Sequence, residues 1–230
     1  GDKIKEGCAY AYSSIILYLY NRPKESKDDA LKSITILQAL GEYWDLSAAY
    51  VFKIFSCCIS GSFKEALETN EEFLVLTNKA QNLQNLGWAL QYFGKVNAFL
   101  GDISDKAIGC VKESIKLLEQ TRDTMHKLEG IGWLAFLYLR KDEYDKAIEN
   151  HKLCLQYVET SKNIFAKAKY YDAYGITLAW SGKYAEAREY HLKTLNINEE
   201  LSRSDLEVEL TKNYYIPRVN VIIQKMNIAN

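Results

Sequence analysis

The sequence has few of the residues that break regular structure. Only two prolines and twelve glycines occur among 230 residues, and neither type clusters into a linker. Strands are not indicated, because no segment between turn signals alternates polar and apolar residues with period two. The length allows one or two globular domains or a single solenoid.

The sequence also lacks an excess of charge and a long apolar run. Its 29 basic and 30 acidic residues leave a net charge of -1, so there is no basic stripe of the kind that binds nucleic acid. No apolar segment approaches the ~20 residues that span a bilayer. Lys3 and Lys5 precede a tyrosine-rich segment without a signal-peptide cleavage pattern. We therefore expect neither a nucleic-acid partner nor a membrane partner.

Cysteine motifs are missing as well. The five cysteines, an odd number, are scattered through segments that have a helical pattern, and no C-x-x-C or H-x-x-x-H spacing occurs. This usage is typical of reduced thiols in a cytoplasmic protein. We expect no metal site and no disulfide framework.

What the chain does contain is an internal repeat. The segment DEYDKAIENHKLCL (142–155) returns forty residues later as GKYAEAREYHLKTL (182–195). Self-similarity at a fixed period indicates a repeat architecture. The matched pairs are Tyr144 and Tyr184, Ala147 and Ala187, Glu149 and Glu189, His151 and His191, and Leu155 and Leu195.

Helical periodicity and turn signals divide the chain into helix pairs within a single solenoid domain spanning 1–230. The predicted repeats are 3–41, 43–78, 82–121, 124–161 and 164–202, and a capping helix at 204–227 contains Pro217. Ser26 is expected to begin the second helix after Pro23, and Ser62 with Glu65 forms a capping-box pattern. We expect the chain to be part of a longer protein.

A small residue early in each second helix sets the register. Ala30, Ala66, Ala107, Ala147 and Ala187 lie 36, 41, 40 and 40 residues apart. Together with Gly175 or Ala135 late in a first helix and glycine at the turn, this pattern resembles the tetratricopeptide repeat (TPR). The resemblance implies an all-α, right-handed superhelix of about five helix pairs plus the capping helix. Close packing would place Gly175 against Ala187, and Ala135 against Ala147.

Periods near forty are similar to those of the helical arrays in bacterial multidomain regulators, such as signalling ATPases, TPR-linked cyclases and peptide-pheromone receptors. In this family, ligands lie along the concave surface of the first helices. Register carries that groove onto Trp88, Gln91, Tyr92, Lys95, Phe99, Glu129, Trp133, Phe136, Arg140, Lys169, Asp172, Ile176 and Trp180. The three tryptophans suit a peptide or helix partner, although each could instead fill a contact between repeats.

The sequence offers no catalytic constellation. His151 and His191 occupy equivalent positions on second helices, where the family has a bulky packing residue, and no nucleophile lies at a spacing that would orient either ring. Gly130-Ile131-Gly132 precedes no G-K-[ST], so a phosphate loop is not indicated. The chaperone-type carboxylate clamp is not reproduced, since Val51, Phe55, Gln91 and Lys95 stand at its positions. We expect no enzyme activity and no cofactor.

Two functional classes remain. One is a non-catalytic scaffold that binds a protein or peptide through its concave groove. The other is a ligand-sensing module of a larger signalling protein, linked to an ATPase, a cyclase or a transcription regulator. The first helix is apolar on nearly every face, although a terminal solenoid helix needs a polar outer side. We therefore expect further repeats, another domain or a second copy of the chain to pack on it.

Overall fold

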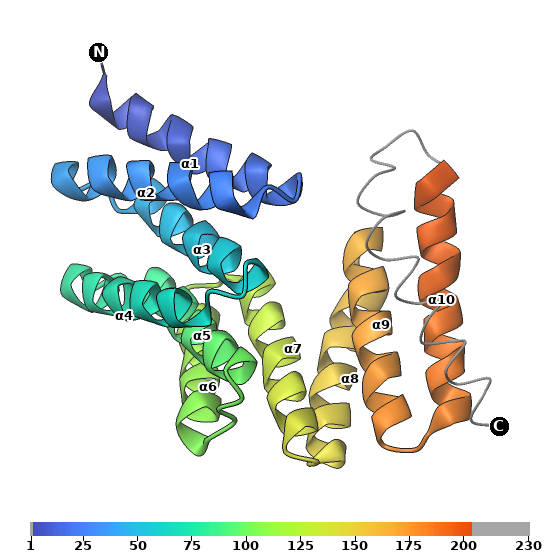
Figure 1. The fold of residues 1–230 in the computed structure, drawn as a ribbon. Helices are drawn as coiled ribbons and strands as arrows, with labels where there is room; N and C mark the ends of the chain where they lie inside the picture. Colours follow the sequence, from blue (N-terminus) through green and yellow to red (C-terminus); the bar gives the residue numbers. More distant parts are fainter. Residues whose placement is uncertain (1, 204–230) are drawn as a thin grey trace. The chain divides into compact units, whose positions relative to one another are not determined.

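The computed structural model describes residues 2–203, and these residues form helices and turns without a strand (Figure 1). The fold is all-α, as predicted. The ten helices are α1 (Lys3–Leu19), α2 (Pro23–Leu40), α3 (Trp44–Ile59), α4 (Phe63–Ala80), α5 (Leu83–Phe99), α6 (Asp105–Gln120), α7 (Thr124–Arg140), α8 (Tyr144–Thr160), α9 (Ile164–Trp180) and α10 (Tyr184–Arg203). The predicted capping helix at 204–227 lies outside the described residues.

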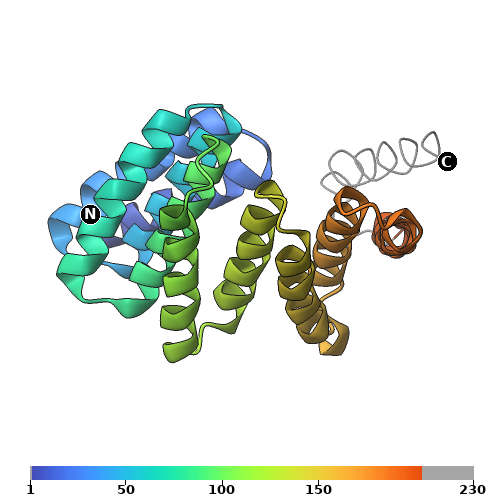
Figure 2. The same ribbon diagram turned by 90° about the horizontal axis from the view of Figure 1, so that it is seen from below.

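The described residues form two compact units, 2–130 and 131–203, whose boundary falls within α7. In the first unit, each helix packs on the next, and α3 also contacts both α1 and α5. The first helices of successive pairs therefore make up one layer of that unit. In the second unit, α9 packs on both α8 and α10 (Figure 2). None of the described helices is long and apolar enough to cross a bilayer.

The helices end in turns that recur about every twenty residues. Gly101, for example, has a positive φ of 86°, and its amide and that of Asp102 donate to the carbonyls of Ala98 and Asn97 at 3.2 and 2.8 Å. This left-handed turn satisfies carbonyls that the helix end leaves free. Positive φ values recur at Asn21, Gly41, Gly61, Gln81, Gly101, Arg122, Asp142 and Gly182.

The register alanines are all buried, as close packing of the helix pairs requires. Ala30, Ala66, Ala147 and Ala187 are 0% exposed, and Ala107 is 1% exposed. A Cβ built on Gly94 would lie 2.3 Å from Val111 Cγ2 and 3.1 Å from the Ala107 carbonyl oxygen. Glycine is therefore needed where α5 crosses α6.

The expected contact between Gly175 and Ala187 stays a prediction, but the structure shows which side chain packs closest to the glycine. The atoms nearest a Cβ on Gly175 belong to the His191 ring, with Cε1 at 2.8 Å. His191 lies one turn beyond Ala187 on α10, so it faces the same side of the helix and reaches the glycine first. A buried imidazole thus fills the space that the missing side chain leaves.

One predicted helix start and one predicted side-chain cap were wrong. Helix α2 begins at Pro23 rather than Ser26, because a first-turn amide has no helical acceptor and proline therefore loses nothing there. The buried Ser26 hydroxyl donates instead to the Ser14 carbonyl of α1 at 2.7 Å. Ser62 precedes α4 without a side-chain cap, and Glu65 pairs with Lys27 of α2 at 3.0 Å. The Ser26 side chain therefore links α2 to α1, and the Glu65 side chain links α4 to α2.

Candidate partner-binding surface

An aromatic row crosses the first helices of the first unit. The Tyr18 ring of α1 stacks on Phe55 of α3 at 5.3 Å between centroids and meets Phe52 edge-on at 5.6 Å. Phe55 in turn meets Tyr92 of α5 at 5.1 Å. Edge-on and offset rings at these distances attract one another. Tyr92 is buried, whereas Tyr18, Phe52 and Phe55 stay half-buried and leave part of their rings accessible.

Lys95 places a cation on this row. Its Nζ lies 4.1 Å from the Phe55 ring centroid and 5.5 Å from that of Tyr92, while the residue is only 9% exposed. An ammonium over an aromatic face is stabilised by the ring quadrupole, more strongly when water is excluded. Burial raises the pKa of the neighbouring Cys58 thiol to about 11, although the charge of Lys95 opposes the shift. Cys58 therefore stays a protonated thiol at neutral pH.

A second aromatic row lies at the beginnings of α3, α5 and α7. The Trp44 ring meets the Trp88 ring edge-on at 5.9 Å, and Trp88 lies 4.6 Å from the His126 ring. Trp44 is 56% exposed and Trp88 only 9% exposed. Trp88 is thus held by packing, while Trp44 offers indole surface to a partner.

Asp123 anchors the second row through its carboxylate. Trp88 Nε1 and Gln84 Nε2 both donate to Asp123 Oδ2 at 2.9 Å, and His126 Nδ1 also lies 2.9 Å from it. Partial burial alone would raise the pKa of Asp123. The hydrogen bonds from Gln84, His126 and Trp88 outweigh that effect, so the pKa is lowered. The carboxylate remains ionised and fixes both the indole and the imidazole.

The other predicted residues of the first unit differ in environment. Gln91 is fully buried, and neither its Oε1 nor its Nε2 has a hydrogen-bond partner among the described residues. Phe99 is 43% exposed and stacks at 5.9 Å on Phe63, at the beginning of α4. Glu129 of α7 is half-buried. Of these predicted residues, Tyr92 and Lys95 therefore lie together, whereas Phe99 packs on Phe63 of α4.

In the second unit, Trp133 and Phe136 form a half-buried edge-on ring pair at 5.4 Å. Trp180 is 59% exposed at the end of α9. Of the remaining predicted residues, Arg140 and Lys169 are exposed, with Lys169 Nζ 5.6 Å from the Tyr170 ring, and Asp172 and Ile176 are half-buried. The continuous groove expected along Trp88, Trp133 and Trp180 spans both units, and it stays a prediction.

The repeat histidines are buried. His151 is 3% exposed, and burial lowers its pKa to about 4. His191 is 0% exposed; its Nδ1 lies 3.3 Å from Asp172 Oδ1, but the two atoms do not meet hydrogen-bond geometry. Within residues 2–203, no group of three or more His, Cys, Asp or Glu side chains is arranged to hold a metal ion. None of the five cysteines, all of which lie in the described residues, forms a disulfide, and burial raises the pKa of the Cys57 and Cys154 thiols to about 12.

Register reasoning missed half of the aromatic surface, although a signal for it was present. Phe52 and Phe55 precede Tyr92 and Lys95 by forty residues, so the register applied to the second repeat would have selected them. Trp44 and Asp123 lie at helix starts, outside the positions that the repeat pattern carries over. Only packing shows that Trp44 and Asp123 both contact Trp88.

No family model and no curated protein matches the sequence. Solved structures do match. The nearly identical TPR-like repeats assigned to a kinesin light chain of Podosopora anserina share 13% identity with a TM-score of 0.61, covering 85% of this chain and 96% of that one. A Rap protein complexed with Competence and Sporulation Factor shares 14% identity with a TM-score of 0.68, covering 100% and 67%. A signal-transduction ATPase (STAND) protein with a TPR sensor, from Pyrococcus horikoshii, shares 16% with a TM-score of 0.62, covering 100% and 40%.

The chain has the tetratricopeptide fold. The resemblance inferred from the register alanines is therefore confirmed at the level of the fold. At these sequence identities the similarity concerns only the backbone arrangement of the helix pairs.

Proposed function

We propose that this TPR-fold chain is a non-catalytic scaffold that binds a protein or peptide segment. The observation that carries the proposal is the aromatic row on α1, α3 and α5, in which Tyr18, Phe52 and Phe55 keep part of their rings accessible. The Lys95 ammonium lies near the Phe55 ring and the buried Tyr92 ring. Accessible aromatics supply buried apolar area when a protein or peptide segment binds. The exposed indole of Trp44, whose ring contacts Trp88 of α5, offers further aromatic surface in the same unit.

The side-chain chemistry favours binding over catalysis. In the part of the chain that the structure describes, no hydroxyl or thiol is hydrogen-bonded to a histidine ring that could activate it. Burial raises the pKa of Cys57, Cys58 and Cys154 and so favours the weakly nucleophilic thiol form. His126 is held by Asp123 against an indole, an arrangement that orients a ring for packing or hydrogen bonding.

A peptide selection on the whole chain tests the proposal. Peptides enriched from a random library should shift the amide resonances of α1, α3 and α5. Tyr18→Ala removes one edge of the aromatic row and should weaken these peptides at least tenfold while leaving helicity intact. Tyr157→Ala, which truncates a 39% exposed tyrosine of α8, is the matched control and should bind normally. Equal binding by Tyr18→Ala would refute a site on this surface.

The groove predicted for the second unit is proposed as an extension of the same function. Trp133→Ala removes one ring of the pair with Phe136, and it should weaken a partner that is long enough to reach this unit. Substitution of Lys152, an exposed residue on α8, should have no effect. Normal binding of every selected partner by Trp133→Ala would confine the site to the first unit.

The alternative proposal is a ligand-sensing module within a larger signalling protein. It is supported by the shared fold with the TPR sensor of the signal-transduction ATPase and with the Rap protein that was solved in complex with a signalling factor. A sensor should change the distance between dyes placed in the two units when its ligand binds, whereas a passive scaffold should not. Fluorescence energy transfer, with the selected peptides as ligands, distinguishes the two functions.

A further inference from the structure

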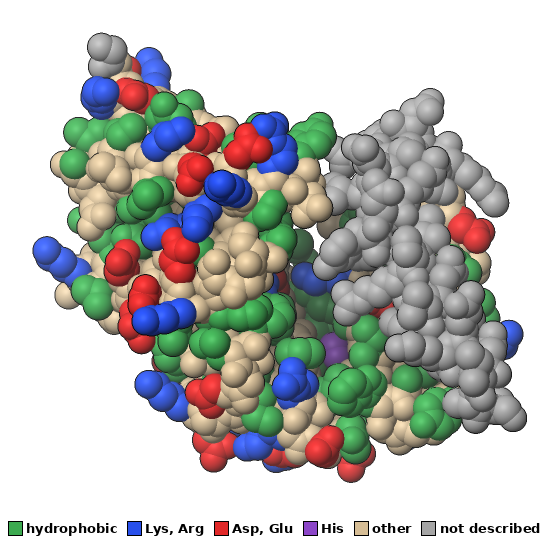
Figure 3. Space-filling model, viewed as in Figure 1, with side chains coloured by type: hydrophobic (Ala, Val, Ile, Leu, Met, Phe, Trp, Pro, Cys, Tyr) green, Lys and Arg blue, Asp and Glu red, His purple; other side chains and the backbone are tan. Residues whose placement is uncertain are grey.

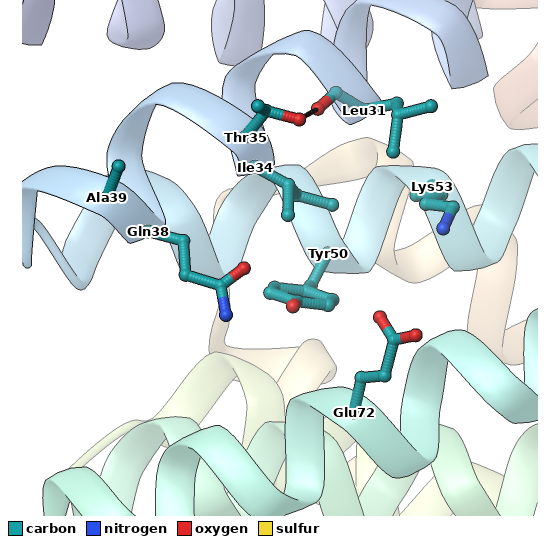
Figure 4. A pocket seen from close by; sticks show the side chains of 8 residues that line it. All are labelled: Leu31, Ile34, Thr35, Gln38, Ala39, Tyr50, Lys53 and Glu72. Carbon is teal, nitrogen blue, oxygen red and sulfur yellow. Dashed lines mark hydrogen bonds between the residues drawn. The ribbon is translucent and has the colours of Figure 1, made fainter.

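An open surface pocket of about 470 Å³, hereafter the cavity, lies between α2, α3 and α4 of the first unit (Figure 4). Most of its lining side chains are exposed, namely Leu31, Thr35, Gln38, Ala39 and Glu72. Its floor on α3 consists of Tyr50 and Lys53, which share one helix face. Phe52 and Phe55 of the aromatic row lie two residues further along, about 200° around the helix at 3.6 residues per turn. The cavity is therefore on the opposite side of α3 from the proposed partner surface.

The cavity follows from how α2 and α4 are joined. Lys27 and Glu65 connect the beginnings of these helices at 3.0 Å. The lining residues Ile34 and Gln38 lie two or more turns further along α2, and Glu72 lies about two turns further along α4. The ion pair thus joins α2 and α4 near their first turns. Between their later turns, Tyr50 of α3 lies at the bottom of the remaining space.

Three polar side chains line this space without partners in the described chain. Gln38, Lys53 and Glu72 make no side-chain hydrogen bond or ion pair with described residues, and Lys53 and Glu72 do not pair with each other. Figure 4 shows Gln38 of α2 and Glu72 of α4 pointing toward the Tyr50 ring. Thr35, by contrast, is satisfied, because its hydroxyl donates to the Leu31 carbonyl at 2.9 Å.

Charged side chains on these helices differ in their pairing. Lys32 pairs with Asp29 at 2.8 Å and Lys64 with Glu68 at 3.9 Å, whereas Lys24, Asp28 and Glu71 pair with no described residue. On the face seen in Figure 3, basic and acidic side chains of the first unit are interspersed. A lysine and a glutamate that face one cavity and remain apart are suited to a ligand that brings both opposite charges.

The floor adds an apolar contact and a hydrogen-bond donor. Tyr50 is 2% exposed and stacks on Phe73 at 5.2 Å, with the rings 8° from parallel. Burial, and next the Glu72 charge, raise the pKa of Tyr50 to about 12, so the phenol stays protonated at neutral pH. Its hydroxyl has no partner among the described residues. Ile34 is 6% exposed beside it.

We propose that this cavity binds a small zwitterion of the amino-acid class that carries an apolar side chain. The ligand carboxylate pairs with Lys53, its ammonium pairs with Glu72, and its side chain lies over Ile34 and the Tyr50 ring. The volume is within the range of small-molecule sites, and a few convergent polar groups on an apolar floor are typical of them. The open setting and the small ligand limit the affinity to a dissociation constant on the order of 1 mM.

The test is a titration of the whole chain with L-phenylalanine, followed by amide chemical shifts. Saturable shifts should centre on residues 31–39, 50–53 and 72. N-acetyl-L-phenylalanine lacks the ammonium and L-phenylalaninamide lacks the carboxylate, so each should bind at least fivefold more weakly. Absence of saturable shifts at the cavity, or equal binding of all three compounds, overturns the proposal without any variant.

Two substitutions then test the orientation of the ligand. Lys53→Met should abolish the preference for phenylalanine over its amide and keep the preference over the N-acetyl compound. Glu72→Gln should do the reverse. Glu71→Gln, an exposed neighbour that does not line the cavity, is the matched control and should leave both preferences unchanged. Preferences that survive both Lys53→Met and Glu72→Gln also overturn the assignment.

Discussion

The two units use the same helix crossing with different chemistry. Val111 of α6, His151 of α8 and His191 of α10 are forty residues apart and occupy one register position. In the first unit, Val111 packs on Gly94, so that contact is apolar. In the second unit, His191 packs on Gly175, and His151 is a buried imidazole. The repeat fixes where two helices meet, but it does not fix whether the side chain at that contact is an ionisable one such as histidine.

The largest expected difference between the units is their response to acid. The pKa of His151 is lowered from an unfolded value near 6.5 to about 4 by burial. Between these values the unfolded state binds a proton that the folded state does not. The second unit should therefore lose about 3 kcal/mol of unfolding free energy as pH falls from 6.5 to 4, and none above 6.5. Native-state hydrogen exchange of α8–α10 measures the loss.

His151→Leu should remove most of this acid sensitivity. The first unit provides the internal control, because the pKa of Asp123 is lowered and its contribution is lost only as pH falls below about 4. The comparison fails if α2–α5 lose protection over the same pH range, or if the second unit of His151→Leu remains as acid-sensitive as the parent.

The next largest effect should come from the crossing glycines. Gly94→Ala places a Cβ 2.3 Å from Val111 Cγ2 and near the Ala107 backbone oxygen, and it should cost about 2 kcal/mol despite the better helix propensity of alanine. Gly175→Ala meets the His191 ring at 2.8 Å and should cost about 1 kcal/mol. Urea denaturation followed in each unit measures both.

Shortening the opposing side chain sharpens this test. Val111→Ala in the Gly94→Ala background should recover part of the loss, because the removed methyl groups are those that the new Cβ would strike. Gly109→Ala is the control: nothing lies within 4 Å of its Cβ position, so it should stabilise the protein slightly through helix propensity. A larger cost at Gly175 than at Gly94 would contradict the ranking.

The smallest effects should come from the turns, which are alike in both units. Arg122 has a φ of 58°, so Arg122→Gly should raise the stability of the first unit by about 0.5 kcal/mol. Gly182 has a φ of 81° with open space around it, so Gly182→Ala should lower the stability of the second unit by about 1 kcal/mol through the backbone alone. Thermal melting measures both changes in stability. A lower melting temperature for Arg122→Gly, or a higher one for Gly182→Ala, would mean that the backbone conformation at these turns does not limit stability.

The fold was largely predictable because its signals are local. The alanine register, the helical spacing and Gly41, Gly101 and Gly182 at helix ends all lie within about one helix of the feature that they determine. The errors at Ser26 and Ser62 have one cause. Their surroundings in sequence resemble helix caps, but Ser26 and Glu65 found partners on neighbouring helices instead.

The candidate site was predictable only in part. Tyr92 and Lys95 were selected by register, and so were Trp133 and Phe136, which form a ring pair in the second unit. Trp44, His126 and Asp123 were not selected, because their contacts with Trp88 join helices that are 35 to 44 residues apart. The repeat pattern does not specify which aromatic ring the exposed indole of Trp44 contacts.

The sequence by itself determined that helices of about seventeen residues pair with a period near forty, since periodicity, caps and small residues act over one or two turns. Tertiary structure alone decided which side chains become buried, paired or left facing a cavity. His151 and His191 occupy one register position, yet their neighbours differ. Lys53 and Glu72 are ordinary surface residues in the sequence, and only the packing of α2, α3 and α4 places both beside Tyr50. Such properties depend on distances between helices, which no single helix specifies.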